Sequence, residues 1–486
     1  DGMECRHQGD PTTFEVIGAW DDDTDPDLDC LELGKIGDVV FLACGDAGVK
    51  CVNVADPENP TLIGALPVSG HARTLAVLGN AVYIGVGGAV HIVDVTDPYQ
   101  PVYLGLVGGA PFDADVVRVT VDGDTLYCLL ADGRIAVADA SADVFAPVVI
   151  RVLDAVAPGV IATDLAVEDG IGYCSYLGVG AYIIDLRKAR VPGPFTPLTL
   201  WHSAPQDVLR LHVRERVLGC LFGDGRVVLT DARDLTAPVV LSESPGPALG
   251  TVIKIFRRWS FCGFGHTLSL IDIPLHVRWL SHRAGTVGAC AEAALDVHLS
   301  SPVVTSTITA SNLVVSTGGA PVAGDRAVDD DVVTFTPAGG AFTEAVQSVL
   351  VRQRYLRNVR ETLGVRYDFA ATFEVGAACI DWTFTPDGVY GGGEAELSFR
   401  VNGAVPDETR VWVSPWFDPA DPWALATRIG GVDSGAGGFT ARWSTPRTRA
   451  PRNWYVVAEA VIGGRSYFGP VAVVTVRPIL SQTPPP

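Results

Sequence analysis

The chain has 486 residues, with 35 Lys and Arg against 56 Asp and Glu, which gives a formal net charge of −21. A chain this acidic is a poor candidate for binding nucleic-acid backbones, because that function requires clustered cations. Hydrophobic residues make up 48% and charged residues 19%, so the chain can bury sizeable cores and is not disordered as a whole. At roughly 100–200 residues per domain, we expect two to four domains. No run of 18 or more apolar residues is present, so no membrane-spanning helix is predicted.

Residues 1–29 form an acidic N-terminal segment. The first 50 residues hold 13 Asp and Glu against 3 Lys and Arg. The most acidic run lies at 21–29, and its alternate carboxylates are Asp21, Asp23, Asp25 and Asp27. Alternating carboxylates on one loop can supply several of the six to eight oxygens that Ca²⁺ binds. A calcium site and a solvated acidic loop are the two interpretations of this run.

Residues 30–286 contain an internal repeat. Each copy has an alternating apolar strand that ends in Asp or Asn and is followed by a turn with proline, as at 51–60 and 92–101. The marker residues of the six copies are 41 to 46 positions apart: Asn53, Asp94, Asp139, Asp185, Asp231 and Asp272. Six copies at this period indicate six supersecondary units.

Each repeat contains four predicted strands. Leu75 and Ile84 lie on the first and second strands of one copy, and Val119 and Cys128 have the same offset of nine in the next. An Asp-Gly turn such as the one at Asp132 connects the second strand to the marker strand. A fourth strand follows the proline. Four antiparallel strands in roughly 40–45 residues are typical of a β-propeller blade. We therefore predict a six-bladed propeller over residues 30–286, with seven blades as the alternative.

The copies at 51–60 and 92–101 resemble the LVIVD repeat, which is named for its marker strand and occurs in bacterial and archaeal surface and secreted proteins. The resemblance covers about 270 residues and is strongest in these two copies, because the later four lose the Asp-Pro dipeptide. It implies a propeller, and it implies no shared catalytic residues.

Residues 14–20 match the pattern of the fourth strand at 62–66. We expect this segment to complete the last blade and close the ring, which would remove the exposed edges of a linear sheet. Residues 276–280 are the competing candidate for that position.

Two further β modules follow the repeats. Residues 332–337, Val-Val-Thr-Phe-Thr-Pro, and the closing strand at 367–373 resemble a bacterial Ig-like module common in surface-layer and adhesion proteins. That module is predicted over 287–377. Alternating strands separated by Gly, Pro and Asp turns predict a second Ig-like or fibronectin-like sandwich over 378–478. Residues 479–486 form a Pro-rich tail. The predicted fold class is therefore all-β, a propeller followed by two Ig-like β-sandwich domains.

The ten cysteines fall into two sets. One set occupies the second-strand position of the repeat, where Ile84 stands in the remaining copy: Cys44, Cys128, Cys174, Cys220 and Cys262. We expect these to be buried thiols that pack as small hydrophobic groups. The other set is Cys5, Cys30, Cys51, Cys290 and Cys379. Cys5 and Cys30 bracket the acidic segment, and Cys290 and Cys379 bracket the first Ig-like module. Both pairs are candidate disulfides in an exported protein.

The first strands of the repeats begin with charged residues, which would meet at the mouth of the propeller channel. They are His71, Arg73, Asp115, Arg118, Asp164, Asp207 and Arg210. Of these, Arg73, Arg118, Asp164 and Arg210 are candidates to bind a small anionic or polar ligand. The alternative is that these charges pair with one another and plug the channel.

No motif for a P-loop, a zinc-binding histidine pair or a catalytic triad is present. We expect a non-catalytic extracellular or cell-surface scaffold or adhesion protein that contacts other envelope proteins or itself. No cofactor other than calcium and no nucleic acid is expected. The first residue, Asp1, is typical of a processed, exported protein. A glycan- or small-ligand-binding propeller is the alternative function, and a secreted hydrolase or lyase is a further one.

Overall fold

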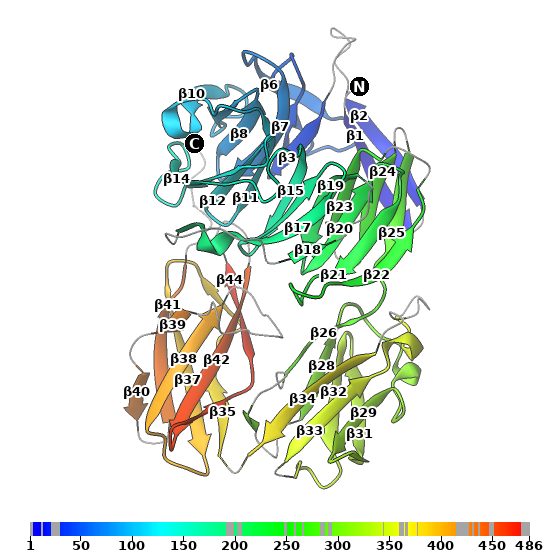
Figure 1. Ribbon diagram of the computed structural model, residues 1–486, viewed down its shortest axis with the longest axis vertical. Coiled ribbons are helices and arrows are strands. Elements are labelled where there is room, and N and C mark those ends of the chain that lie inside the picture. Colours follow the sequence, from blue (N-terminus) through cyan, green and yellow to red (C-terminus); the bar gives the residue numbers. More distant parts are fainter. Residues whose placement is uncertain are drawn as a thin grey trace. The chain divides into compact units, whose positions relative to one another are not determined.

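The computed structural model divides the chain into two compact units, Asp1–Ile271 and Asp272–Pro486 (Figure 1). The structure describes residues 3–10, 13–20, 30–190, 199–201, 207–246, 250–256, 259–264, 267–281, 287–289, 294–343, 345–358, 364, 368–376, 378–414, 427–429, 432–435, 438–446 and 452–477. Within these ranges the structure is all-β, apart from four short 3-10 turns: η1 (Val107–Gly109), η2 (Leu186–Arg190), η3 (Thr305–Thr307) and η4 (Gln353–Tyr355). None of the described helices is long and apolar enough to cross a membrane.

Six antiparallel sheets follow one another along the first unit, and we call them blades 1 to 6. Each of the first five has four strands in simple meander order, and the sixth has three among the described residues. Blades 1 to 3 are β3 (Glu32–Ile36), β4 (Val39–Ala43), β5 (Val49–Asn53), β6 (Thr61–Leu66); β7 (Ala72–Leu78), β8 (Ala81–Val86), β9 (Ala89–Asp94), β10 (Val102–Leu106); and β11 (Val116–Asp122), β12 (Thr125–Leu130), β13 (Ile135–Asp139), β14 (Val148–Leu153). Blades 4 to 6 are β15 (Ala162–Glu168), β16 (Ile171–Tyr176), β17 (Gly180–Asp185), β18 (Thr199–Trp201); β19 (Val208–Arg214), β20 (Val217–Phe222), β21 (Val227–Asp231), β22 (Val239–Ser244); and β23 (Val252–Phe256), β24 (Trp259–Phe264), β25 (Thr267–Asp272).

The cores of the first unit lie between successive blades. Tyr83 and Ile92 of blade 2, for example, share one buried cluster with Leu126 and Cys128 of blade 3. Both faces of the second strand are covered, which is why β8, β16 and β20 are buried along their whole length. Each sheet therefore packs face to face on the next, as propeller blades do.

The N-terminal residues form a separate hairpin of β1 (Met3–Asp10) and β2 (Thr13–Trp20). Here the sequence prediction is wrong, because β2 pairs with β1 in a two-stranded sheet and not with the last blade. The hairpin is held through Trp20, which packs against Val40, Leu42 and Val52 of blade 1. The burial of this large side chain holds the hairpin against blade 1, although neither of its strands pairs with a strand of that blade.

The second unit contains four sheets that pack as two sandwiches. The first pairs β26 (Val277–Leu280), β28 (Leu295–Leu299), β32 (Val332–Pro337), β31 (Gly324–Asp329) with β27 (Val287–Ala289), β34 (Phe369–Val375), β33 (Val346–Val351), β29 (Leu313–Thr317), β30 (Ala320–Pro321). The second pairs β35 (Cys379–Phe384), β37 (Glu394–Asn402), β41 (Gly438–Ser444), β40 (Val432–Gly435) with β36 (Gly388–Tyr390), β44 (Ala472–Arg477), β42 (Arg452–Ile462), β38 (Glu408–Ser414), β39 (Thr427–Ile429), and β43 (Arg465–Phe468) pairs with β42.

The first sandwich begins earlier than the sequence predicts. Strand β26, the competing candidate for ring closure, pairs with β28, and Val277 lies opposite Leu299. Leu275 and Val277 are buried in the core of this sandwich with Phe335 and Phe373. The boundary predicted after residue 286 therefore lies too late, because these apolar residues belong to the sandwich core.

A candidate site at the propeller axis

The innermost strands of blades 1 to 5 each carry a polar residue directly before an aligned apolar one, and blade 6 has Val252 at that place. The apolar residues of blades 2 to 6 are Leu75, Val119, Leu165, Leu211 and Ile253, each at most 4% exposed. The residues before them, together with the one before Leu33 in blade 1, include Glu32, Thr74, Arg118, Asp164 and Arg210. In consecutive blades these innermost strands lie side by side. Their polar side chains therefore gather along one axis, and this gathering is the candidate site.

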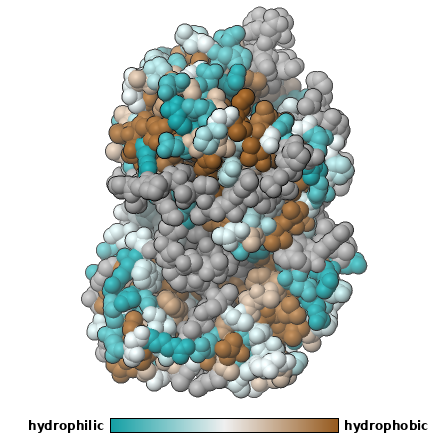
Figure 2. Space-filling view, in the orientation of Figure 1, coloured by the Kyte–Doolittle hydropathy of each residue, from teal (hydrophilic) through white to brown (hydrophobic). Residues whose placement is uncertain are grey.

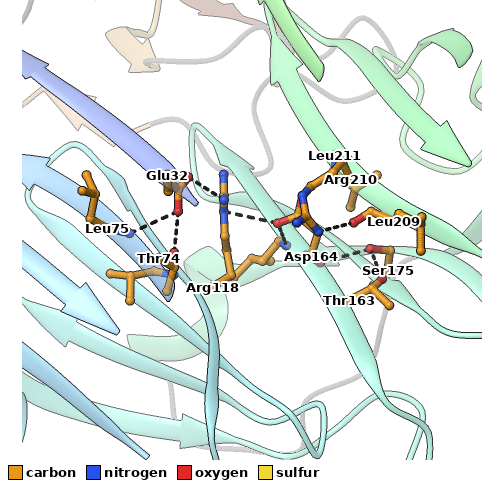
Figure 3. Close-up of polar contacts among 12 residues, drawn as sticks. Glu32, Thr74, Leu75, Arg118, Thr163, Asp164, Ser175, Leu209, Arg210 and Leu211 are labelled. Carbon is orange, nitrogen blue, oxygen red and sulfur yellow. Dashed lines mark hydrogen bonds and ion pairs between the residues drawn. The ribbon is translucent and has the colours of Figure 1, made fainter. Parts of the chain in front are cut away.

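Arg118 is the centre of this group (Figure 3). Its Nη1 atom lies 2.5 Å from Glu32 Oε1 in blade 1, and its Nε atom lies 3.2 Å from Asp164 Oδ1 in blade 4. Burial alone would lower the pKa of Arg118, but the charges of Asp164 and Glu32 outweigh burial and raise it. The guanidinium is therefore fixed in its charged form between two carboxylates from different blades.

The same carboxylates also bind backbone groups of neighbouring blades. Glu32 Oε2 accepts hydrogen bonds from the Thr74 hydroxyl at 2.6 Å and from the Leu75 amide at 3.1 Å. Asp164 Oδ2 accepts one from the Leu211 amide at 2.8 Å. An innermost strand has no sheet partner on its axial edge, so its N–H groups need acceptors from elsewhere. Thr74 meets the same need one blade further on, because its hydroxyl oxygen accepts from the Val119 amide at 3.1 Å.

His212 and Lys254 extend the group to blades 5 and 6. His212 Nδ1 accepts a hydrogen bond from the Ile255 amide at 3.0 Å, which places the proton of the neutral ring on Nε2. Burial, together with the charges of Lys254 and Arg118, lowers the pKa of His212 to about 3. Lys254 also has a lowered pKa, through burial and the charge of Arg118, although its side chain is accessible to solvent. The charges of Glu32 and Asp164 act in the opposite direction and raise the pKa of Lys254, so its ammonium lies near both axial carboxylates while it still reaches solvent.

These contacts show how the blades are arranged. Arg118 of blade 3 touches side chains of blades 1 and 4, and its charge acts on His212 of blade 5 and Lys254 of blade 6. One side chain can do this only if the innermost strands surround a common axis. The first unit is therefore a β-propeller. We call Glu32, Arg118 and Asp164 the axial clasp; both carboxylates already pair with Arg118 and accept hydrogen bonds from backbone amides.

The four residues predicted to bind a ligand have different surroundings. Arg118 and Asp164 are brought together as an ion pair, and the Asp164 side chain is only 2% exposed. Arg73 and Arg210 are exposed on separate strands, and one Arg210 nitrogen donates to the carbonyl of Leu209 at 2.9 Å. A ligand site at the mouth stays a prediction, and its accessible members are Arg73 and Arg210.

Sequence reasoning missed Glu32, Thr74, His212 and Lys254. The signal was present, because Glu32 and Thr74 precede aligned apolar residues of the repeat just as Arg118 does. The predicted calcium ligands Asp21, Asp23, Asp25 and Asp27 lie outside the described residues. Across the described residues, no group of three or more His, Cys, Asp or Glu side chains is placed to hold a metal ion.

The cysteine predictions need two corrections. Cys30 forms a disulfide with Cys44, and Cys5 is free, so the predicted pairing of Cys5 with Cys30 is wrong. The reason is the register of the β3–β4 hairpin, in which Glu32 lies opposite Ala43 and the Leu31 amide binds the Ala43 carbonyl at 2.8 Å. This register brings Cys30, just before β3, next to Cys44, just after β4. Cys44 is also not the predicted free thiol of the second strand, because Leu42 pairs with Leu33 there as Ile84 pairs with Leu75, and Cys44 follows the end of β4.

The other cysteines behave more simply. The remaining second-strand cysteines are buried free thiols, as predicted: Cys128, Cys174, Cys220 and Cys262. Burial raises the pKa of Cys128 and of Cys174 to about 12. Cys379 is disulfide-bonded, and Cys290 lies outside the described residues.

Comparison with known proteins supports the repeat. Residues 69–107 match the LVIVD repeat, and this range spans the four strands β7 to β10, so one repeat is one blade. The first unit is therefore a β-propeller in which residues 69–107, blade 2, match the LVIVD repeat. Among solved structures, the WD40 β-propeller domain of Doa1 is similar at 12% identity and a TM-score of 0.38, with 56% of this chain and 89% of that chain covered. BamB from Moraxella catarrhalis is similar at 13% identity and a TM-score of 0.35, with 49% and 70% covered. No curated protein matches the chain.

Proposed function

We propose that the protein is a non-catalytic extracellular or cell-surface scaffold whose propeller binds other proteins. The observation that carries the proposal is a set of apolar rows on the outermost strands of the blades. On β14 the side chains of Val148, Ile150 and Val152 are between 39% and 63% exposed. On β10 of the neighbouring blade, Val102 and Leu104, two residues apart, are 52% and 46% exposed.

Rows of this kind favour a binding surface. Figure 2 shows hydrophobic residues on the first unit in the region where Figure 1 labels β14. Single exposed apolar residues are common, but contiguous apolar surface on a soluble protein is typical of a protein interface. The axial polar residues, in contrast, are already bound to one another and offer little to a substrate.

The disulfides support the proposed location. Cys30 is bonded to Cys44, and Cys379 is disulfide-bonded as well. Disulfides form and persist in oxidising compartments and are rare in the cytosol. This chemistry favours an exported protein, as does the LVIVD match, whose family resemblance implies surface and secreted proteins.

The test is the native mass of the protein, gently extracted from its source and measured by size exclusion with light scattering. A scaffold is expected to elute far above the chain mass of 51.2 kDa, with companion proteins in a fixed ratio. A clean monomer in every extract contradicts the proposal. In that case the glycan- or small-ligand-binding alternative is tested with the double variant Arg73→Ala, Arg210→Ala in a ligand-binding panel.

A further inference from the structure

We propose that the propeller unit contains a further blade position between blade 6 and blade 1, which, among the residues that the structure describes, is occupied only in its outer half by the β1–β2 hairpin. The inner half is a docking site for a β-hairpin from a different protein. This inference rests on the proposed scaffold function and specifies the form of one partner.

The first argument is the register of the hairpin. In β1–β2, Cys5 lies opposite Gly18 and the register shifts directly after Cys5. In β5–β6, Cys51 lies opposite Gly64 and the register shifts directly after Cys51. Strands β5 and β6 are the third and fourth strands of blade 1. The β1–β2 hairpin therefore has the form of the third and fourth strands of a blade, without the first and second.

The second argument is the position of β2. A side chain on Gly64 of β6 would collide with the carbonyl oxygen of Pro98, in the turn of the next blade. A side chain on Gly18 of β2 would collide with the carbonyl oxygen of Pro57, the equivalent turn residue of blade 1. Strand β2 therefore packs against the turn of blade 1 in the same way that β6, the outer strand of blade 1, packs against the turn of blade 2. It occupies the outer-strand position of the blade that precedes blade 1.

Blade 6 does not supply the missing inner strands. It already has its own third strand, β25, which ends in the marker residue Asp272. Strand β1 of the hairpin also has the register of a third strand, and β1 and β2 form a sheet separate from blade 6. The hairpin and blade 6 are therefore two different positions around the axis.

The third argument is exposure on the walls of this position. Leu33 of β3 is 57% exposed, whereas its equivalents in blades 2 to 6, Leu75 to Ile253, are at most 4% exposed. Those equivalents face the preceding blade: Leu75 lies against Gly34 of blade 1, and Ile253 lies against Gly219 of blade 5. Leu33 has the same place on its strand, yet solvent covers it. On the opposite wall, Val252 of β23 is 41% exposed.

The repeat itself indicates what fits between these walls. Everywhere else, the innermost strand packs against the first two strands of a neighbouring blade, an antiparallel hairpin with alternating apolar residues. A second copy of this chain is a poor donor, because each described hairpin already lies in a sheet. Lys254 is accessible on the same face of β23 as Val252, and burial and the charge of Arg118 outweigh Glu32 and Asp164 there, so a carboxylate on the incoming strand is favoured. We therefore assign the site to a hairpin of another protein that has alternating apolar residues and a carboxylate on its inner strand.

The test uses a hairpin of known blade geometry as the probe. The peptide covering residues 162–176, the first two strands of blade 4, carries an acidic residue at the inner position and is made with Cys174→Ser and a fluorophore. Its binding to the full chain is followed by fluorescence anisotropy. We expect saturable one-to-one binding that Leu33→Glu weakens by about tenfold or more. Val346→Glu, a matched change at an apolar residue of β33 that is 52% exposed, should leave the affinity unchanged. A scrambled peptide should not bind.

Three results overturn the proposal: no saturable binding of the peptide, equal binding of the scrambled peptide, or equal affinity of the Leu33→Glu variant with an unchanged melting temperature. These results leave the scaffold function untouched, because that function is judged by the native mass. If the native assembly exists and survives Leu33→Glu, the partner binds elsewhere and only the docking site is refuted. If the extracts hold only monomer while the peptide binds as expected, the scaffold function falls and the site stands.

Discussion

Replacing Arg118 with methionine should destabilise the propeller through the two carboxylates left behind. Arg118 has a side-chain exposure of 19%, and its partners Glu32 and Asp164 are 13% and 2% exposed. Breaking a buried ion pair from one side typically costs about 3–5 kcal/mol, because an uncompensated charge stays buried. Both carboxylates keep their backbone donors, so we expect the lower end, about 3 kcal/mol.

Hydrogen exchange is the suitable assay, because a chain of several domains does not unfold in two states. The amides of Leu75 and Leu211 are bound by Glu32 and Asp164, so their exchange reports on the clasp directly. A loss of about 3 kcal/mol corresponds to exchange roughly 100-fold faster, since each 1.4 kcal/mol is a factor of ten.

Two controls make this result specific. Arg73→Met removes an exposed arginine from β7 and should change exchange at these amides by less than about threefold. The triple variant Glu32→Gln, Arg118→Met, Asp164→Asn removes all three charges and should recover most of the loss, since replacing a whole buried ion group is often close to neutral. If Arg118→Met and Arg73→Met exchange alike, the reasoning about the axial clasp is refuted.

The disulfide and the free thiols give further predictions. Reduction of Cys30–Cys44 should destabilise blade 1 by about 3 kcal/mol, because the bond closes a loop of 14 residues; thermal unfolding with and without reductant measures this, and an unchanged midpoint contradicts it. Iodoacetamide at pH 8 should label Cys5 and spare Cys128, whose pKa burial raises to about 12; peptide mass spectrometry reads the labelling, and equal labelling of the two argues against the packing described. The lowered pKa of His212 means that the unfolded chain binds a proton first, so stability should fall as the pH drops from about 6.5 towards 3, by about 2 kcal/mol at pH 5. His212→Gln, which keeps an acceptor, should flatten that fall, and an unchanged pH profile would exclude the assigned cause.

The blades could be predicted from the sequence because their pattern is local. Each strand, turn and marker residue recurs within 41 to 46 positions, and β7 to β10 lie where the repeat places them. The axial clasp could not be assigned in the same way. Arg118 pairs with Glu32 from two blades earlier, and the period of a repeat does not say which blades meet across the axis.

The N-terminal hairpin shows a second limit. Residues 14–20 match an outer strand in sequence, and Gly18 does sit in an outer-strand position. The pattern could not show that β2 pairs with β1, because the partner of an outer strand depends on long-range packing, here through Trp20. The Cys30–Cys44 disulfide was missed for a related reason, since it depends on the register of β3 on β4.

The most direct test of the propeller as a binding head is the labelling rate of Leu33→Cys with a maleimide, in the isolated chain and in the native assembly. Position 33 is read by peptide mass spectrometry, with Val346→Cys as the exposed reference, since Val346 is 52% exposed. The structure predicts rapid labelling of position 33 in the isolated chain, since Leu33 is 57% exposed, and clear protection in the assembly. Protection of position 33 already in the isolated chain would contradict an open blade position, and equal rapid labelling in both states would show that no partner occupies it.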